Sequence, residues 1–486
     1  MTTYLTTTIP YVNARPHIGF ALELVQADVL ARHRRSRGED VRLLSGTDEN
    51  SLKNVLAAAA AGVEVRTLVD RNAAAFEALQ EPLALRLDDF IRTSRDPRHP
   101  VGVEELWRRC AASGDLYRRH YRGRYCVGCE QFYTVEELAD GRCPEHGTEP
   151  QFVEEENWFF RLSRYTGQLR AAITEGRLRI DPPARRNEVL GLLAAGLPDF
   201  SVSRSRERAH GWGIPVPGDD SQVIYVWWDA LGNYITSLGL DSPDFDRWWR
   251  GSERRIHLCG KGVLRFHAVY WPALLLSAGL PLPTDILVHD YLTVDGRKIS
   301  KSAGNTVDPV QLVDDYGTDA VRWWLLREVA KVGDTDFTVN RLVERANADL
   351  AGGIGNLVKR VVTLIHRQCD GRAPESDSAA LPECATVPAE VAAALDGYDF
   401  RRATAALWQL PTAANRYLDQ NRPWSDPTTA PRHLAVLLHA CRTLGELLTP
   451  FLPDAAGHVL AQCTPGPDGR LPEARTLFPR RYPQSA

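Results

Sequence analysis

The sequence of 486 residues has no apolar run of the ~18 residues that a membrane-spanning helix needs. Its N-terminus lacks a basic segment followed by an apolar one, so no signal peptide is predicted. The formal net charge is only −4, which gives no support for a surface that is basic overall. Methionine occurs only at position 1. These absences exclude a protein with spanning helices and a generally basic nucleic-acid-binding protein.

Cysteine is also scarce. The nine cysteines are an odd number and are scattered outside one cluster, which argues against a disulfide framework. The pattern favours a reducing compartment, and we expect a cytoplasmic location. A chain of this length is too long for one hydrophobic core and predicts about three domains. Two short basic runs, residues 32–37 and 118–124, could form local patches for RNA, although such runs are usually solvated faces.

The N-terminal segment predicts a strand, a loop and a helix in that order. Residues 4–9 are β-branched and aromatic, and Pro10 and Pro16 bracket a tight loop. From His17 onward the apolar residues recur at helical spacing. A helix start after a strand offers backbone N–H groups and a positive dipole end to a phosphate. Within His17-Ile18-Gly19-Phe20, the histidine could donate a hydrogen bond to a phosphate oxygen, and Gly19 leaves room for a flat base.

A second polar stretch follows almost three hundred residues later. It reads Lys298-Ile299-Ser300-Lys301-Ser302 and precedes a glycine. Two lysines and two serines on one loop can bind polyphosphate, although a lone lysine pair is more often a solvated loop.

Between these two stretches, the sequence predicts a buried strand at residues 40–44 and a loop at residues 45–50. Asp48 could bind a substrate amino group there, and Glu49 could cap the next helix.

The cysteine cluster has the spacing of a metal site. Cys126 and Cys129 are followed, after thirteen residues, by Cys143 and His146. Two pairs of this kind can close a tetrahedron around zinc, and four protein ligands leave no open position. We therefore predict one structural Zn²⁺. Further on, the apolar run at residues 223–227 predicts a central parallel strand.

The two polar stretches together resemble the H-I-G-H and K-M-S-K-S signatures of class I aminoacyl-tRNA synthetases. Short sequence motifs of the methionyl-tRNA synthetases are similar to residues 10–13, 225–230 and 265–267. The resemblance covers residues 6 to about 461. It implies an α/β fold, a Rossmann-like doubly wound parallel sheet with a zinc-bearing connective insertion, and a C-terminal all-α bundle. The expected division is a catalytic domain at residues 1–115 and 223–300, the insertion at 116–222, a connection at 301–344 and an anticodon-binding domain at 345–486.

The resemblance implies that the chain activates L-methionine with ATP and Mg²⁺ and transfers it to methionine tRNA. The catalytic residues would be His17, Lys298 and Lys301. ATP would contact Tyr11, Asn13, His17, Gly19, Phe20, Lys298, Ser300, Lys301 and Ser302. Methionine needs a dry, aromatic-walled pocket, and the candidates are Ile9, Tyr11, Asp48, Trp227, Ala230, Leu231, Tyr234, Val263 and His267.

The C-terminal region predicts helices, with Leu350, Ile354, Leu357, Val361 and Leu364 on one stripe. Asn356 and Arg360 share another face of that helix and could read the edge of an unstacked base. Trp424 could provide a stacking surface. All three match anticodon-reading positions of the family. We expect no DNA or membrane partner, and a monomer because no dimerising tail follows.

The sequence departs from the family pattern at four positions, Phe20, Asn50, Ser51 and Gly262, where the family has His, His, Gly and Asp. Phenylalanine cannot donate to a phosphate, and losing one such donor costs roughly 3–4 kcal/mol in comparable sites. The departures leave two alternatives to a methionine--tRNA ligase. One is a divergent paralogue that binds methionine tRNA with weak or no charging. The other is an inhibitor-resistant or specialised-pathway enzyme that activates methionine.

Overall fold

The computed structural model describes all residues except 129–130, 134, 145–146, 300–303, 376–380 and 484–486. It divides the chain into two compact units, each built from three segments. The first unit comprises Met1–Pro16, Gly38–Ala78 and Arg86–His289. The second comprises His17–Arg37, Leu79–Leu85 and Asp290–Ala486. Within the described residues, no helix is long and apolar enough to cross a membrane.

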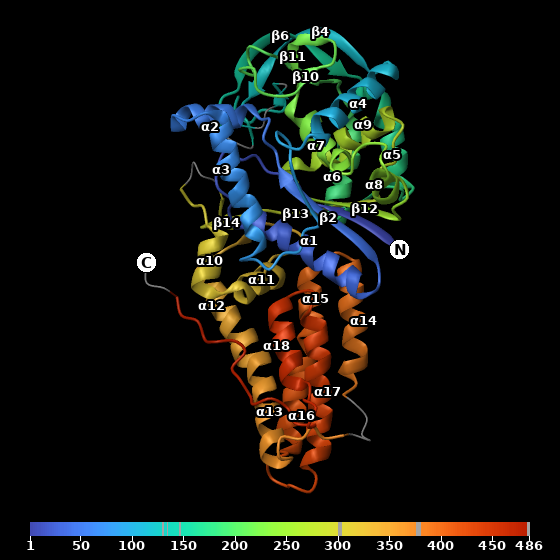
Figure 1. Ribbon diagram of the computed structural model, residues 1–486. Helices are drawn as coiled ribbons and strands as arrows, with labels where there is room; N and C mark the ends of the chain where they lie inside the picture. The colour runs from blue at the N-terminus through green and yellow to red at the C-terminus, as the bar shows by residue number, and fades with distance from the viewer. Residues whose placement is uncertain (129–130, 134, 145–146, 300–303, 376–380, 484–486) are drawn as a thin grey trace. The chain divides into compact units, whose positions relative to one another are not determined.

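The first unit is built on a six-stranded sheet in which all neighbouring strands are parallel (Figure 1). The prediction of an α/β fold with a Rossmann-like parallel sheet is therefore confirmed. Strand order reverses beside β1, where ligands of open parallel sheets bind at the carboxyl ends. In spatial order the strands are β3 (Asp89–Arg92), β2 (Asp40–Thr47), β1 (Thr2–Thr6), β12 (Arg254–Gly260), β13 (Asp285–His289) and β7 (Arg179–Asp181).

Most helices of the first unit, though not the two between residues 52 and 77, bury their apolar faces in one large core with the sheet. Helix α4 packs on α7, and Gly102 permits the close approach, because a Cβ there would lie 2.5 Å from Thr236 Cγ2. The helices of this unit are α2 (Leu52–Ala61), α3 (Val65–Glu77), α4 (Arg98–Ala112), α5 (Thr166–Thr174), α6 (Pro183–Ala195), α7 (Val226–Thr236), α8 (Pro243–Phe245) and α9 (Trp271–Ser277).

The prediction of a central parallel strand at residues 223–227 is wrong. Strand β11 (Asp219–Ile224) belongs to a separate antiparallel sheet with β9 (Ser203–Ser205) and β10 (Pro215–Val216), and α7 begins at Val226. A short apolar run cannot distinguish a strand from the start of a buried helix. Here Asp229 in the first turn favours the helix through the dipole.

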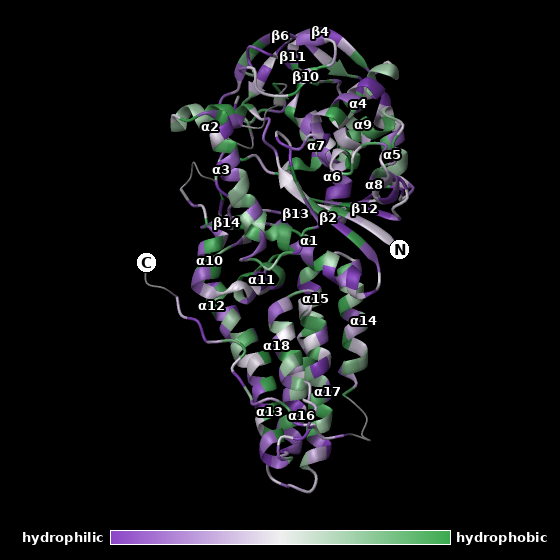
Figure 2. Cartoon of the chain, in the orientation of Figure 1, coloured by the Kyte–Doolittle hydropathy of each residue, from purple (hydrophilic) through white to green (hydrophobic). Residues whose placement is uncertain are grey.

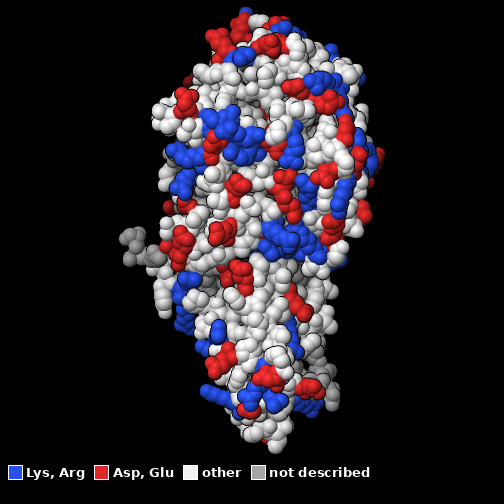
Figure 3. Space-filling view, viewed as in Figure 1, with Lys and Arg blue, Asp and Glu red and all other residues white. Residues whose placement is uncertain are grey.

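A four-stranded antiparallel sheet carries the basic run at residues 118–124. Its order is β5 (Gln131–Tyr133), β4 (Leu116–Cys126), β6 (Gln151–Phe160) and β8 (Phe200–Ser201). Arg118 pairs with Glu156 at 3.2 Å and Arg122 with Glu154 at 2.8 Å. Acidic residues of β6 thus neutralise part of this run. On the face seen in Figure 3, Lys and Arg are likewise interspersed with Asp and Glu.

The second unit is mainly helical, which confirms the predicted helical C-terminal region. Of the predicted stripe, Leu350, Ile354, Leu357 and Val361 are buried. Figure 2 shows hydrophobic and hydrophilic residues alternating along these helices, as amphipathic packing requires. The helices are α1 (Ile18–Ser36), α10 (Pro309–Tyr316), α11 (Thr318–Arg327), α12 (Val339–Arg345), α13 (Asn356–Gln368), α14 (Glu383–Asp396), α15 (Phe400–Leu407), α16 (Gln409–Asn421), α17 (Ala430–Leu448) and α18 (Pro453–Cys463).

A small sheet completes the second unit. Strand β14 (Leu292–Val294) lies between β15 (Arg297–Lys298) and β16 (Thr335–Asp336). It pairs antiparallel with β15 and parallel with β16. Through β15, this sheet positions Lys298, the first residue of the stretch that is predicted to bind polyphosphate.

Candidate active site

His17 caps the N-terminus of α1, as the strand, loop and helix pattern predicts. Its backbone is extended, and its Nδ1 accepts a hydrogen bond from the Gly19 N–H at 3.1 Å. Since Nδ1 is an acceptor, the neutral ring carries its proton on Nε2. Gly19 is required for this arrangement, because a Cβ at that position would lie 2.8 Å from His17 Cε1. The Phe20 ring packs against the imidazole with ring centroids 4.5 Å apart.

The surroundings of His17 keep its ring neutral. Burial, together with the smaller effect of the nearby positive charge of Lys298, lowers the pKa of His17 from 6.5 to about 4. A neutral imidazole at neutral pH can donate one N–H to an anionic oxygen without first losing a proton. The site therefore presents a neutral donor at the positive end of a helix dipole.

Lys298 lies in the same unit as His17. Its ammonium group sits 4.1 Å from the centroid of the Tyr291 ring, and its carbonyl accepts from the Asn305 amide at 3.2 Å. The N–H of Ile18, at the start of α1, donates to the Val307 carbonyl at 2.9 Å. These contacts bring the start of α1 together with the segment that follows Lys298. The predicted residues Ser300, Lys301 and Ser302 lie outside the described part of the chain.

The predicted methionine residues gather in the first unit. Trp227 stacks on Phe266 with ring centroids 3.6 Å apart and planes 8° apart, and Tyr11 meets Trp227 edge-on at 6.1 Å. Ala230 and Leu231 are buried on the same helix as Trp227. Ile9 and Val263 are partly buried against the same core. The structure thus places Ile9, Trp227, Leu231 and Val263 in or against the same core.

His267 is the polar member of this group and is held in one neutral form. Tyr234 Oη lies 2.7 Å from His267 Nε2, and Nδ1 lies 2.9 Å from the Val263 carbonyl. A carbonyl only accepts, so Nδ1 donates and Nε2 accepts from the tyrosine hydroxyl. The pair is buried, with His267 2% exposed. It can therefore line an apolar pocket without presenting an unpaired charge.

Asp48 follows β2 at the carboxyl end of the sheet and is 2% exposed. Its N–H donates to the Pro10 carbonyl at 2.9 Å, so its backbone pairs with Tyr11 in the loop that also holds Asn13. The Asn54 amide donates to the Asp48 carbonyl at 3.2 Å. A buried carboxylate in this position has the chemistry to bind an ammonium group.

The residues after Asp48 do not act as predicted. Glu49 does not cap α2, because Ser51 does so by accepting the Lys53 N–H at 3.0 Å. Glu49 instead pairs with Arg92, whose Nε lies 2.7 Å from Glu49 Oε1. Asn50 donates to Asp229 at 2.8 Å. The departure at Gly262 lies in a single turn, Lys261–Val263, directly after β12.

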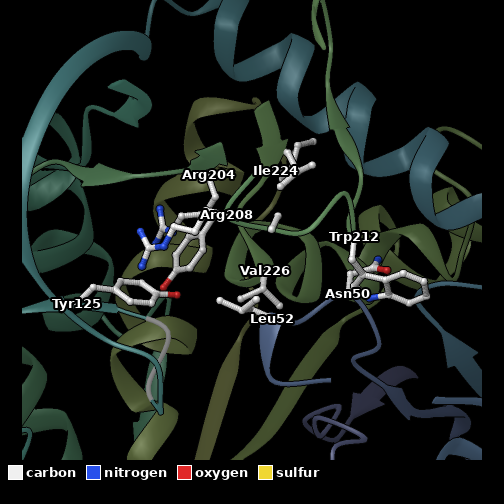
Figure 4. A pocket seen from close by; sticks show the side chains of 11 residues that line it. Asn50, Leu52, Tyr125, Arg204, Arg208, Trp212, Ile224 and Val226 are labelled. Carbon is white, nitrogen blue, oxygen red and sulfur yellow. The ribbon is translucent and has the colours of Figure 1, made fainter. Parts of the chain in front are cut away.

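An open pocket of about 380 Å³ lies beside this loop and was not predicted from the sequence (Figure 4). Asn50 and Trp212 stand on one side of it, and Arg204, Arg208 and Tyr125 stand on the other. The Arg204 guanidinium is 4.2 Å from the Tyr225 ring centroid, and that of Arg208 is 4.0 Å from the Tyr125 ring centroid. Its walls combine flat rings with positive charge.

The predicted anticodon positions lie in the second unit. Asn356 begins α13 and is exposed, and Arg360 on the same helix pairs with Asp419 of α16 at 3.2 Å. Trp424 follows α16 and is 44% exposed, which is high for this residue type. An exposed aromatic ring is available for stacking on a base.

The predicted zinc ligands are described only in part. Cys126 and Cys143 are both 1% exposed and lie in one small buried cluster with Tyr133. Their partners Cys129 and His146 lie outside the described residues. Among the residues that the structure does describe, no group of three or more His, Cys, Asp or Glu is placed to bind a metal. The structure nevertheless brings the two described ligands, Cys126 and Cys143, together in one cluster.

Sequence reasoning missed several residues of the site. The sequence predicts Phe266 only as part of a family motif and not as a pocket residue. Its stacking on Trp227 brings together two segments that are far apart in the sequence. Lys53 lies over the Tyr11 ring, with its ammonium 4.4 Å from the centroid. Asp229 contacts both Asn50 and His99, which lie in distant parts of the sequence. No local spacing signals any of these contacts.

Comparisons with known proteins cover nearly the whole chain. The family model described as tRNA synthetases class I (M) matches residues 3–151 and 134–362. The model of the anticodon binding domain of methionyl tRNA ligase matches residues 370–476. The methionine--tRNA ligase of Brucella suis is 40% identical over 94% of this chain and 90% of its own length. That of Mycobacterium bovis is 39% identical over 99% of this chain and 98% of its own length.

Solved structures agree with these matches. The structure of Mycobacterium tuberculosis methionyl-tRNA synthetase in complex with methionyl-adenylate has a TM-score of 0.91 and 38% identity, covering 99% of this chain and all of the other. The apo form of the same enzyme has a TM-score of 0.84 and 36% identity, covering 99% and 98%. Sequence and fold therefore agree that this chain belongs to the methionyl-tRNA synthetase family of class I aminoacyl-tRNA synthetases.

Proposed function

We propose that this chain is a methionine--tRNA ligase that activates methionine with ATP and transfers it to methionine tRNA. The observation that carries the proposal is the neutral, α1-capping His17 held close to the Lys298 segment. The named relatives are ligases, which favours charging over the alternative of a paralogue that only binds tRNA. An inhibitor-resistant or specialised enzyme has no observation here that favours it.

The first step joins methionine to AMP. The methionine carboxylate attacks the α-phosphate of ATP, and pyrophosphate leaves as the bond to the β-phosphate breaks. We assign to His17 Nε2–H, Lys298 and Lys301 the stabilisation of negative charge on the phosphate. The remaining ATP contacts are proposed for Tyr11, Asn13, Gly19, Phe20, Ser300 and Ser302. Phe20 would contribute packing against His17 instead of a second donor.

Methionine would be oriented by Asp48, which binds its amino group, and by the aromatic stack of Trp227 and Tyr11. Ile9, Ala230, Leu231, Tyr234, Val263 and His267 are proposed to complete the dry pocket for the thioether. In the second step the 3′ hydroxyl of the tRNA attacks the methionyl carbonyl and AMP leaves. No covalent enzyme intermediate is required, because positioning and charge stabilisation carry both steps.

Two metal ions are part of the proposal. Mg²⁺ would accompany ATP, since no dedicated magnesium site is needed for phosphate chemistry of this kind. A structural Zn²⁺ would be held by Cys126, Cys129, Cys143 and His146. The burial of the two described thiols in one cluster fits this assignment, because thiolate pairs on short turns are typical zinc ligands. When bound, the ion would stabilise the hairpin of β4 and β5.

The tRNA would be recognised at its anticodon by Asn356, Arg360 and Trp424. Because Arg360 pairs with Asp419, binding of a base would have to replace or share that contact. The division into catalytic halves at residues 1–115 and 223–300, an insertion at 116–222, a connection at 301–344 and an anticodon domain at 345–486 is part of the same proposal. The monomeric state and the cytoplasmic location stay predictions.

The deciding experiment is methionine-dependent exchange of labelled pyrophosphate into ATP by the purified protein, followed by charging of methionine tRNA. Exchange and charging by the unaltered protein would support the proposal. A protein that binds methionine tRNA without exchange would contradict it. Comparison with Phe20→His then measures what the missing second donor contributes to the rate.

A further inference from the structure

A buried carboxylate joins two segments that carry predicted methionine contacts. Asp229 is 1% exposed and lies in the first turn of α7. One of its oxygens accepts from the Asn50 amide at 2.8 Å, and the other is in hydrogen-bond contact with His99 Nε2. An ionised carboxylate only accepts, so both partners donate to it. Asp229 thus connects the loop after β2 with α7 and with the start of α4.

Each connected segment presents part of the proposed pocket. The loop after β2 holds Asp48, two residues before Asn50, and α7 carries Trp227 two residues before Asp229. The hydrogen bond between Asn50 and Asp229 therefore links the loop that holds the proposed amino-group contact to the helix that holds the proposed aromatic wall. A displacement of either partner would change the spacing of these two contacts. Figure 4 shows Asn50 beside Trp212 at the edge of the neighbouring pocket.

The loop is fixed from its other side as well. The Trp212 indole donates to the Glu49 carbonyl at 2.8 Å, and the Glu49 N–H donates to Thr93 Oγ1 at 2.9 Å. Asn50 contributes the remaining link, from this loop to α7. Without that link, the loop would keep its attachments to the sheet and would lose its hydrogen bond to the helix that bears Trp227.

His99 holds the carboxylate from behind. With Nε2 donating to Asp229, Nδ1 accepts the hydroxyl proton of Thr236, 2.7 Å away on the last turn of α7. His99 is fully buried, so its ring cannot turn without losing both partners. The close packing of Gly102 on Thr236 further restricts movement of α7 against α4. A replacement of Asp229 by an apolar residue would leave the donors of His99 and Asn50 unpaired.

We propose that Asp229, held by His99, is a positioning residue that sets the affinity for methionine through Asn50. The inference rests on the proposed function, because it assigns the effect to the methionine site of that reaction. Asp229 does not touch the substrate. It fixes the separation between Asp48 and Trp227, so the loss of its link to Asn50 weakens methionine binding and leaves ATP binding unchanged.

The test uses the full-length protein and compares KM for methionine with KM for ATP in pyrophosphate exchange. Asn50→Leu removes the amide donor at a partly exposed position with little change in volume, and we expect KM for methionine to rise about tenfold or more. KM for ATP and kcat are expected to change less than about threefold, since the chemistry is not altered. Asn50→His keeps an N–H donor and should restore most of the methionine affinity.

Ser277→Ala is the matched control. Its hydroxyl donates to another buried carboxylate of the same unit, Asp115, at 2.7 Å, away from the proposed pocket. It should lower thermal stability without changing KM for methionine. Unchanged methionine KM in both Asn50→Leu and Asp229→Asn, or an equal rise in both KM values, would overturn the inference.

Failure of the proposed function gives a different result, namely no exchange by the unaltered protein. In that case, equilibrium dialysis with labelled methionine makes the same comparison without catalysis. Weaker binding by Asn50→Leu with recovery in Asn50→His would still support the positioning role. Equal binding by all variants, or no binding by the unaltered protein, would overturn it.

Discussion

At the scale of single residues, the position of the His17 ring depends on the absence of a side chain at residue 19. A Cβ on Gly19 would lie 2.8 Å from His17 Cε1 and 3.0 Å from Nδ1. Gly19→Ala should therefore displace the imidazole and lose its donation to the phosphate. We expect pyrophosphate exchange to fall about a hundredfold or more, the usual effect of losing one such donor.

The control for this change is Gly191→Ala. Gly191 lies inside α6, and a Cβ there meets nothing within 4 Å. Since alanine favours a helix by about 0.5–1 kcal/mol over glycine, this variant should be slightly more stable and equally active. Exchange that survives Gly19→Ala unchanged would show that the observed ring position is not the one used in catalysis.

The depressed pKa of His17 predicts the direction of a pH effect. The folded protein keeps the ring neutral down to about pH 4, whereas the unfolded chain binds a proton below about 6.5. The contribution of His17 to the free energy of unfolding is thus complete above pH 6.5 and is lost as the pH falls toward 4. Urea unfolding of the unaltered protein and of His17→Gln should differ less at pH 5 than at pH 7.5.

A direct check is the titration of the His17 ring by nuclear magnetic resonance. Lys298→Met removes the second cause of the shift and should raise the pKa of His17 toward its ordinary value, although burial keeps it low. A His17 resonance that titrates near 6.5 in the unaltered protein would contradict the buried, neutral ring. Sequence predicted His17 as a donor, but its tautomer depends on the hydrogen bond from Gly19 and could not be read from the spacing.

At the scale of secondary-structure elements, the sequence predicted those with a clear period or cap. The apolar spacing after His17 matches α1, which begins at Ile18. The prediction of a strand at residues 223–227 was wrong because five apolar residues fit a strand and the start of a buried helix equally well. Ser51 was noted only as a departure from the family, yet its hydroxyl caps α2, a role typical of serine. Because Ser51 caps the helix, the Glu49 carboxylate can form its ion pair with Arg92.

The hairpin of β4 and β5 carries the prediction on zinc. Cys126 ends β4, and Cys143 lies in the same buried cluster. We expect one Zn²⁺ per chain by atomic absorption, and less in Cys126→Ser or Cys143→Ser, because serine is a poor zinc ligand. Cys110→Ser is the control, since that thiol is buried against the Leu274 carbonyl in another part of the same unit.

Removal of the metal should act on stability more than on the chemical step. A strong chelator is expected to lower the melting temperature, and added Zn²⁺ should restore it, because a bound ion stabilises only the folded hairpin. A protein that purifies without zinc and melts at the same temperature in chelator and in Zn²⁺ would exclude the structural site.

At the scale of the whole molecule, no local sequence pattern indicates how the chain assembles its second unit. Helix α1 and residues Leu79–Leu85 belong to the same unit as everything after Asp290. Only tertiary contacts join these segments, and none leaves a local pattern. The Arg322 guanidinium is fully buried and donates to Asp28 of α1, to Leu83 and to Phe451, at 2.8, 2.8 and 2.7 Å. One side chain therefore links all three segments.

This link predicts a large loss of stability on removal of the charge. Arg322→Met removes one donor from the buried carboxylate of Asp28, which keeps its bond to Arg32, and one donor each from the carbonyls of Leu83 and Phe451. Breaking a buried pair of this kind costs about 3–5 kcal/mol. The remaining bond from Arg32 should bring the loss toward the lower end of that range, as measured by urea unfolding followed by circular dichroism.

The exposed pair of Arg37 with Asp396, also at 2.8 Å, provides the comparison within the same unit. Arg37→Met should change the free energy of unfolding by no more than about 1 kcal/mol, because water already solvates both charges. Arg322→Met combined with Asp28→Leu should recover part of the loss, since the buried carboxylate that lost the Arg322 charge is then removed as well. If Arg322→Met costs no more than Arg37→Met, the three segments must be held together by apolar packing instead of by this buried charge.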